Sequence, residues 1–227
     1  MSSESFVISL GGSIIIPDEI DTDFLKSFRE LILKEVSLGK KFIIVCGGGN
    51  TNRKYNNAAR EIVNPSNQDL DWIGIATIML NAELLRIVFG DQAHNKALAD
   101  LSQPIPNDKP IVVGGALEPG HSSDMDAVLA AKNIGAKKLI NLSNTDYVYD
   151  SDPRLNPEAK KIEKISWSEY RKLIPEDWSA KLNSPFDPIA SNLAEQEGMT
   201  VITTNGKNLE NLKKCLDGEE FSGTVIS

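Results

Sequence analysis

Three short apolar segments of this 227-residue chain end in consecutive glycines, and this pattern constrains the fold more than any other feature. The segments are Phe6–Leu10 before Gly11 and Gly12, Phe42–Cys46 before Gly47–Gly49, and Ile111–Val113 before Gly114 and Gly115. A short apolar run bounded by a turn is typical of a buried strand in a parallel sheet. Parallel strands end at one edge of their sheet, where α/β proteins bind ligands. The pattern therefore predicts an α/β protein.

Glycines in such turns suit a phosphate-binding site, because they let backbone N–H groups approach an anion closely. The turns after Leu10 and Cys46 predict two phosphate-bearing ligands. The alternative interpretation is that each cluster only makes a tight connection between a strand and a helix, which glycine serves in any α/β protein. The occurrence of three clusters, each after a strand-like segment, favours ligand binding.

Amphipathic segments alternate with the apolar ones. One helical face is formed by Phe24, Phe28, Leu31, Ile32 and Val36, and Gly39 would end that helix. Further helices are predicted over Thr51–Ile62, Leu70–Val88, Asp124–Ile134 and Asn208–Leu216, and further strands over Lys138–Leu142, Thr200–Thr203 and Thr224–Ile226. A capping box is present in Ser166–Glu169, and Asp187 with Pro188 marks the start of a helix that ends at Gly198. The alternation predicts a three-layer αβα sandwich with a mainly parallel central sheet.

Composition and charge narrow the class of protein. The chain has no linker-like or low-complexity segment, so we expect one domain over residues 1–227. Its net charge of −8 argues against a nucleic-acid surface, which needs clustered Lys and Arg, but not against a small phosphorylated ligand.

We expect Cys46 and Cys215 to be buried free thiols, as in a reducing compartment. The segment Met1–Ser5 has no basic region, and no apolar run approaches the ~18 residues of a membrane span, so we expect a cytoplasmic protein.

Polar residues at the predicted turns and helix starts are the candidates for chemistry: Ser13, Arg53, Asp71, Ser123 and Asp124. Arg53 follows Gly49 in the first turn of a predicted helix, where its guanidinium would join the glycine amides around a phosphate; the alternative is a solvated surface arginine. Ser122 and Ser123 are either simple N-caps or ligands of a phosphate oxygen. The run Asn144–Pro153 offers carboxylates for Mg²⁺ and a tyrosine near a base, or else only a turn rich in Asp and Pro.

In their order and spacing, these residues resemble the amino acid kinase superfamily, and within it the archaeal-type uridylate kinases. The resemblance extends from Phe6 to Ile226 and depends on the set of motifs more than on any one of them. The matching motifs are Leu10–Ser13, Gly47–Gly49 with Arg53, Asp71 with Gly74 and Asn81, Gly114 with Gly115, Pro119–Asp124, Asn144 with Asp146, Val148 with Tyr149, Asp152 with Pro153, Asp187 with Pro188, and Gly218 with Gly223 and Thr224.

The resemblance implies a kinase that transfers the γ-phosphoryl group of ATP to UMP with Mg²⁺ and assembles as a homohexamer. It implies that UMP is held by Gly48, Asp71, Leu117, Glu118, Pro119, Gly120, His121, Ser122 and Ser123. It implies that ATP is held by Gly11, Gly12, Gly49, Arg53, Ser143, Asn144, Asp146, Tyr149 and Asp152. The catalytic residues would be Arg53, Asp124 and Ser13, with Asp124 organising the cationic groups around the reacting phosphates. Such chemistry depends on positioning and charge neutralisation.

Three positions depart from the resemblance. Ser9 stands where many superfamily members carry a lysine aimed at the transferred phosphoryl group, Tyr147 where glycine is usual, and Asp126 where a small apolar residue is common. A tyrosine at 147 is strained if that position requires a positive φ, and a carboxylate at 126 repels phosphates unless it faces away or binds a metal. Two alternatives therefore stay open. One is a superfamily kinase with another acceptor, such as isopentenyl phosphate, carbamate or acetylglutamate, and the other is a non-catalytic nucleotide or oxyanion binder.

Overall fold

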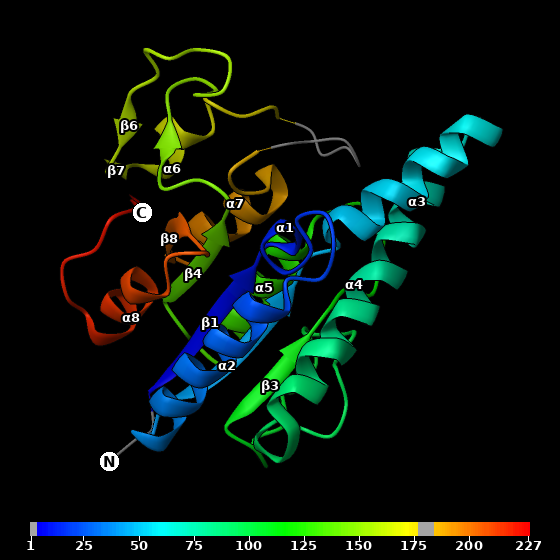
Figure 1. Cartoon of the computed structure of the whole chain (residues 1–227). Coiled ribbons are helices and arrows are strands. Elements are labelled where there is room, and N and C mark those ends of the chain that lie inside the picture. Colours follow the sequence, from blue (N-terminus) through cyan, green and yellow to red (C-terminus); the bar gives the residue numbers. More distant parts are fainter. Residues whose placement is uncertain (1–3, 177–183) are drawn as a thin grey trace.

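The computed structural model describes residues 4–176 and 184–227, and its framework is a seven-stranded sheet (Figure 1). In spatial order the strands are β3 (Ile111–Gly114), β2 (Lys41–Cys46), β1 (Ser5–Leu10), β4 (Lys138–Ser143), β8 (Thr200–Asn205), β9 (Thr224–Ile226) and β7 (Lys164–Ile165). The first five strands are parallel, β9 is antiparallel to β8, and β7 is parallel to β9. The prediction of a mainly parallel sheet is confirmed. Residues 1–3 and 177–183 of the expected domain lie outside the described residues.

Helices cover both faces of this sheet (Figure 1). One face carries α1 (Gly12–Ile15), α2 (Thr22–Ser37), α4 (Asn67–Phe89) and α8 (Leu209–Asp217), and the other carries α5 (Ser123–Asn133), α6 (Trp167–Tyr170) and α7 (Pro188–Gln196). The remaining elements are α3 (Gly49–Ile62), the short 3₁₀ turn η1 (Gly90–Gln92), and a separate two-stranded sheet of β5 (Val148–Tyr149) and β6 (Lys161–Ile162).

The central position of β1 follows from its apolar sequence. Phe6, Ile8 and Leu10 face the core beneath α2, whereas Val7 faces the core beneath α5. Successive side chains of a strand point to opposite faces, so a strand that is apolar throughout becomes buried on both. Two separate cores therefore flank the sheet, and the predicted three-layer αβα sandwich is confirmed.

The local helix signals are confirmed as well, although helix boundaries shift by a few residues. Ser166 caps α6 in a reciprocal capping box, and the carboxylate of Asp187 caps α7. Both cysteines are free and buried. The long helix α4 begins at residue 67 rather than 70, because Ser66 and Asp69 form a second capping box that adds a turn to its start. Neither α1 nor the small β5–β6 sheet was predicted from the sequence.

Helix α4 corrects the expectation that no apolar segment approaches the length of a membrane span. The stretch Asn67–Gln92 contains an 18-residue segment with a mean hydropathy of 1.6, and it is long and apolar enough to cross a membrane by length and composition. Its residues Leu85 and Phe89 nevertheless lie in the core beneath α2. On its other side Trp72, Leu80 and Ile87 are exposed. The helix is apolar all round because one face fills the core and the other remains uncovered in the single chain.

Candidate active site

The first two glycine turns pack directly against each other at the carboxyl edge of the sheet. A Cβ atom on Gly12 would lie 2.1 Å from the backbone nitrogen of Gly49, so no larger residue fits. Gly49 itself has a φ of +65°, which favours glycine. The buried Asn81 of α4 supports the second turn, because its Nδ2 donates to the carbonyls of Gly47 at 2.8 Å and Gly48 at 3.2 Å. We call Gly11–Gly12 and Gly47–Gly49 together the paired glycine turns.

The third glycine cluster, Gly114 with Gly115, lacks side chains for a different reason. It lies at the same edge of the sheet, since β3 is parallel to β2. A Cβ atom on Gly114 would lie 2.6 Å from Cδ1 of Leu101, and one on Gly115 would lie 2.4 Å from Sδ of Met79. These glycines accommodate neighbouring apolar side chains. At this cluster the glycines therefore make room for side chains, a packing role that was not among the interpretations of the sequence.

A cavity of about 140 Å³ lies beside the paired glycine turns, between α3, α4 and the loop that precedes α5; we call it the α3–α4 cavity. Its lining residues are Gly48, Asn52, Asn56, Leu70, Asp71, Gly74, Ile75, Ile78, Ala116, Glu118, His121, Ser122 and Ser123. Six of the nine residues expected to hold UMP are among them. Leu117, Pro119 and Gly120 are not, but the backbone N–H of Gly120 donates to Oδ2 of Asp71 at 2.9 Å, which ties the loop to α4.

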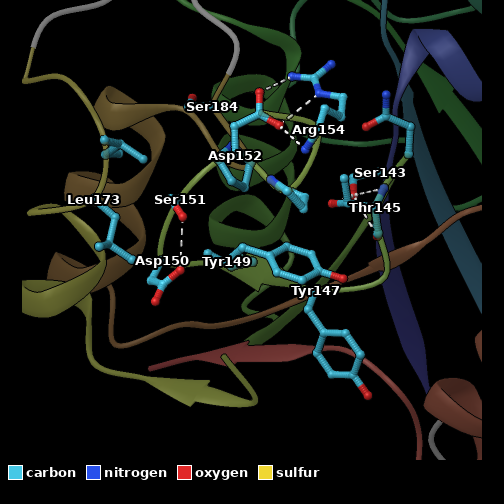
Figure 2. Close-up of a pocket in the computed structure, with 15 residues that line it drawn as sticks. Ser143, Thr145, Tyr147, Tyr149, Asp150, Ser151, Asp152, Arg154, Leu173 and Ser184 are labelled. Atoms are coloured by element: carbon cyan, nitrogen blue, oxygen red, sulfur yellow. Dashed lines mark hydrogen bonds and ion pairs between the residues drawn. The ribbon is translucent and has the colours of Figure 1, made fainter. Parts of the chain in front are cut away.

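A second cavity of about 400 Å³ lies beyond the end of β4; we call it the β4–β5 cavity (Figure 2). Four of the residues expected to hold ATP line it: Ser143, Asn144, Tyr149 and Asp152. Asp152 accepts from Arg154 Nε at 2.9 Å and Nη2 at 2.7 Å, and these hydrogen bonds hold the pKa of Asp152 down at about 2. Figure 2 shows this pair at one side of the cavity and the ring of Tyr149 extending across it.

The paired glycine turns lie between the two cavities and contact the walls of both. Gly48 lines the α3–α4 cavity, and Gly12 packs against Gly49 in the same turn. On the other side the backbone N–H of Gly11 donates to the carbonyl of Leu142 at 3.0 Å. The next residue, Ser143, lines the β4–β5 cavity. One unit of closely packed backbone therefore separates two cavities that lie at the same edge of the sheet.

Other predicted site residues lie apart from both cavities. Arg53 is in the second turn of α3 rather than the first, because that helix begins at Gly49. Its exposed guanidinium donates to Oδ1 of Asn50 at 3.2 Å and to the carbonyl of Pro17 at 3.4 Å. Ser13 is partly buried in α1. Asp146 accepts a hydrogen bond of 3.0 Å from Asn205 at the end of β8.

Asp124 lies at the centre of a buried polar network at the start of α5. Oδ1 of Asp124 accepts from the hydroxyl of Ser9 at 2.9 Å, and its Oδ2 accepts from the backbone N–H of Asp187 at 3.1 Å. The Asp187 carboxylate in turn accepts from the backbone N–H of Ser122 at 3.0 Å. Burial and the neighbouring Asp187 raise the pKa of Asp124 to about 7. Ser9, which stands where many superfamily members carry a lysine, therefore orients Asp124.

Asp126 faces the interior and not the phosphate-binding edge. It is 3% exposed, and its Oδ2 makes no hydrogen bond with the described residues. The nearest ring nitrogen, Nδ1 of His121, is 3.8 Å from that oxygen. Burial, followed by the charge of Asp124, raises the pKa of Asp126 to about 8. At neutral pH this carboxyl is therefore mostly uncharged, which removes the expected repulsion of phosphates.

The third departure, Tyr147, is accommodated without strain. Outside the masked segments no residue other than glycine has a positive φ. The ammonium group of Lys161 lies 4.8 Å from the centroid of the Tyr147 ring. Figure 2 shows this ring pointing away from the Asp152–Arg154 pair. Tyr147 therefore packs beside the β5–β6 sheet and does not require the backbone conformation of a glycine.

Sequence reasoning missed several polar residues of this region. Asn52 and Asn56 line the α3–α4 cavity, and Asp187 belongs to the Asp124 network. Asn56 recurs one helical turn after Asn52 on a helix of low hydrophobicity, so the spacing of four residues is the signal that could have found the pair. Asp187 was predicted as a helix cap, a role that it has, and as part of a matching motif, but not as a partner of Asp124.

Comparison with known proteins gives the context for this geometry. A uridylate kinase from Methanobrevibacter smithii is 35% identical over 97% of this chain and 98% of its own length, and one from Thermoplasma acidophilum is 34% identical over 99% and 97%. The crystal structure of a uridylate kinase from Archaeoglobus fulgidus superposes with a TM-score of 0.81 at 31% identity, covering 99% of this chain and all of that one. The amino acid kinase family matches residues 4–205. The chain belongs to the amino acid kinase family.

Proposed function

We propose that this protein is a UMP kinase, which transfers the γ-phosphoryl group of ATP to UMP and yields UDP and ADP for pyrimidine nucleotide biosynthesis. The observation that carries this proposal is the pair of cavities joined by the paired glycine turns. Two phosphate-bearing ligands bound there would meet at backbone amides, as direct phosphoryl transfer requires. The similarity to archaeal proteins named uridylate kinase over nearly their whole length supports the same acceptor.

In this proposal UMP occupies the α3–α4 cavity and ATP the β4–β5 cavity. Asp71 accepts hydrogen bonds from the ribose hydroxyls of UMP, and its phosphate lies near Ser122 and Ser123 at the N-terminus of α5, which favours anions. Leu117 and Asp146 are expected from the resemblance but lie outside the cavities. In this proposal they help to shape the loops whose other residues line the cavities. The whole chain acts as one domain.

The transferred phosphoryl group carries negative charge that the site must neutralise. We assign this role to the amides of the paired glycine turns, to Ser13 in α1, and to Arg53. The hydrogen bonds that hold Arg53 in this structure are to exposed partners and are replaceable, so its side chain turns toward the bound phosphates. Asp124 positions the groups around them through its contacts with Ser9 and Asp187.

Mg²⁺ enters with ATP in this proposal. The described part of the chain contains no group of three or more His, Cys, Asp or Glu side chains suited to holding a metal ion. Mg²⁺ prefers oxygen ligands and usually keeps several waters while it binds substrate phosphates. The phosphate oxygens of ATP therefore supply most of its coordination, and the ion adds charge neutralisation where Ser9 replaces a lysine.

We also propose that the enzyme is a cytoplasmic homohexamer. The support is the uncovered apolar face of α3 and α4, where Tyr55, Ile62, Trp72, Leu80 and Ile87 are each more than half exposed. Several exposed large apolar side chains on two neighbouring helices are typical of a protein–protein contact. Assembly through this face would bury the side of α4 that faces away from the core.

The test is ADP release from Mg-ATP with UMP, CMP or isopentenyl phosphate as the acceptor. Turnover with UMP of roughly 1 s⁻¹ or more, and less with the others, is the expected result. Arg53→Ala should lower kcat at least tenfold, whereas Lys54→Ala, the next residue on α3, serves as the matched control. Preferential turnover of isopentenyl phosphate would overturn the acceptor assignment. No turnover at all, with thermal stabilisation by UMP or ATP, would identify a non-catalytic nucleotide binder.

A further inference from the structure

Two asparagine side chains of α3 line the α3–α4 cavity, and each has a carbonyl oxygen that no described residue pairs with. Asn56 is only 3% exposed, and Asn52, one helical turn earlier, is partly buried. The Oδ1 atoms of both side chains are buried and accept no hydrogen bond among the residues that the structure describes. Buried polar atoms are almost always paired in folded proteins, so an unpaired one calls for a specific reason. Two on one wall of one cavity point to a ligand that supplies the missing donors.

Glycines at positions 48 and 74 leave space for the side chain of Asn52. A Cβ atom on Gly48 would lie 2.8 Å from Cβ of Asn52, and one on Gly74 would lie 3.6 Å from its Nδ2. The amide of Asn52 therefore fills the space between the second glycine turn and α4. Asn56 follows at the next turn of the same helix, on the same side.

The order of residues along the cavity separates a phosphate end from a far end. Helices α3 and α4 lie side by side and run in opposite directions (Figure 1). Gly48, Asn52 and Asn56 therefore succeed one another along α3, with Asn56 about 12 Å of helix rise beyond Gly48. Gly48 belongs to the paired glycine turns, and Asn56 is the most distant from them of the three residues. A phosphate bound at the glycine end leaves Asn56 to the organic part of the ligand.

The chemistry of the amides selects the part of the ligand that they bind. A phosphate offers acceptors only and cannot pair with Oδ1. A uracil ring presents an N3–H donor beside a carbonyl acceptor, which matches the adjacent acceptor and donor of a carboxamide, as asparagine pairs with the edge of adenine. Leu70 and Ile75 line the same cavity and suit the faces of a planar ring.

We infer that Asn56, with Asn52, hydrogen-bonds the polar edge of the pyrimidine ring of the acceptor and so determines its specificity, an inference that rests on the proposed function. Asp71, which carries acceptor atoms only, is left for the ribose hydroxyls. Neither asparagine belongs to the motifs on which the family resemblance depends.

The test compares kcat/KM for UMP, for N3-methyl-UMP, which lacks the donor, and for dUMP, which lacks the 2′-hydroxyl. The wild-type enzyme should prefer UMP over N3-methyl-UMP by at least a hundredfold. In Asn56→Leu this preference should fall below tenfold, mainly through a higher KM for UMP, while the ratio of UMP to dUMP stays at its wild-type value. Asn57→Ala, an exposed neighbour on α3, should change neither ratio.

Two results with the Asn56→Leu variant would overturn the inference. One is an unchanged preference for UMP over N3-methyl-UMP, and the other is a collapse of the UMP-to-dUMP ratio in its place, which would assign the amide to the ribose. Calorimetric binding of UMP and N3-methyl-UMP to the wild-type protein keeps the inference testable if the variant does not fold. Equal affinities there would also overturn it. Discrimination in binding without any turnover would refute the proposed kinase activity and support the inference about the base.

Discussion

Replacing Asp126 by asparagine tests the electrostatics of the buried acidic network. Burial raises the pKa of Asp126 from its ordinary value of 3.8 to about 8. The folded chain therefore keeps this proton over a pH range in which the unfolded chain has lost it. Since the folded state binds more protons, the free energy of unfolding falls as pH rises from about 4 to about 8. An asparagine has nearly the same shape and no proton to lose, so it escapes this destabilisation.

The size of the effect follows from the width of that window. One group that is protonated only in the folded state changes the free energy of unfolding by up to about 1.4 kcal/mol per pH unit. From pH 5 to pH 7 the stability advantage of Asp126→Asn over wild type should therefore grow by up to about 3 kcal/mol. Relaxation and water entry around the ionised carboxylate reduce this value, so about 1 kcal/mol is the smallest growth consistent with the burial. Near pH 4 the two proteins should differ by less than about 0.5 kcal/mol.

The assay is urea unfolding at one protein concentration, followed by tryptophan fluorescence at pH 4, 5, 6 and 7. A fixed concentration is needed because association of subunits shifts apparent stability. Asp23→Asn is the matched control, since the side chain of Asp23 is 92% exposed and its loss should leave the pH dependence unchanged. Parallel stability curves for wild type and Asp126→Asn between pH 5 and 7 would refute the conclusion that Asp126 holds a proton in the folded state.

Three further substitutions test the paired turns and the β4–β5 cavity. Gly12→Ala should destabilise the fold by about 3 kcal/mol or more in urea unfolding, because the new Cβ would lie 2.1 Å from backbone; a change below 1 kcal/mol would refute the packing of the turns. Asn81→Leu leaves the buried carbonyl of Gly47 unpaired and removes one of the two donors to the carbonyl of Gly48, so it should cost about 1–3 kcal/mol and raise the KM for UMP; an unchanged KM would show that the turn keeps its shape without this support. Asp152→Asn should leave stability within about 0.5 kcal/mol, since its pair with Arg154 is solvent-exposed, but raise the KM for ATP severalfold; an unchanged KM would remove Asp152 from the site.

Much of the fold was predictable because it depends on local patterns. Strand-like runs of three to five residues predicted the five parallel strands, and capping residues such as Ser166 and Asp187 marked helix starts correctly. The glycine clusters pointed to the edge of the sheet at which the two cavities lie. Helix starts at Gly49 and Asn67 were missed by two and three residues, because the cap of each helix lies in a stretch that also has loop character.

The candidate site was predictable in outline, since residues that follow parallel strands meet at one edge whatever the detailed packing. Six of the residues expected to hold UMP do line one cavity, and four expected to hold ATP line another. The position of Arg53 was not predictable in the same way. Its long side chain lies on the surface, where nearby acceptors such as the carbonyl of Pro17 decide its direction.

The sequence by itself determined the layers, the parallel sheet and the edge at which both cavities lie, because periodicity and glycine turns act over a few neighbouring residues. Only the tertiary structure decided what each of those residues contacts. It assigned Gly114 and Gly115 to packing, turned Asp126 toward the interior beside His121, and brought Ser9 to Asp124 across 115 residues of chain. Contacts of this kind depend on strand order and on which helix covers which face, and no local pattern encodes either.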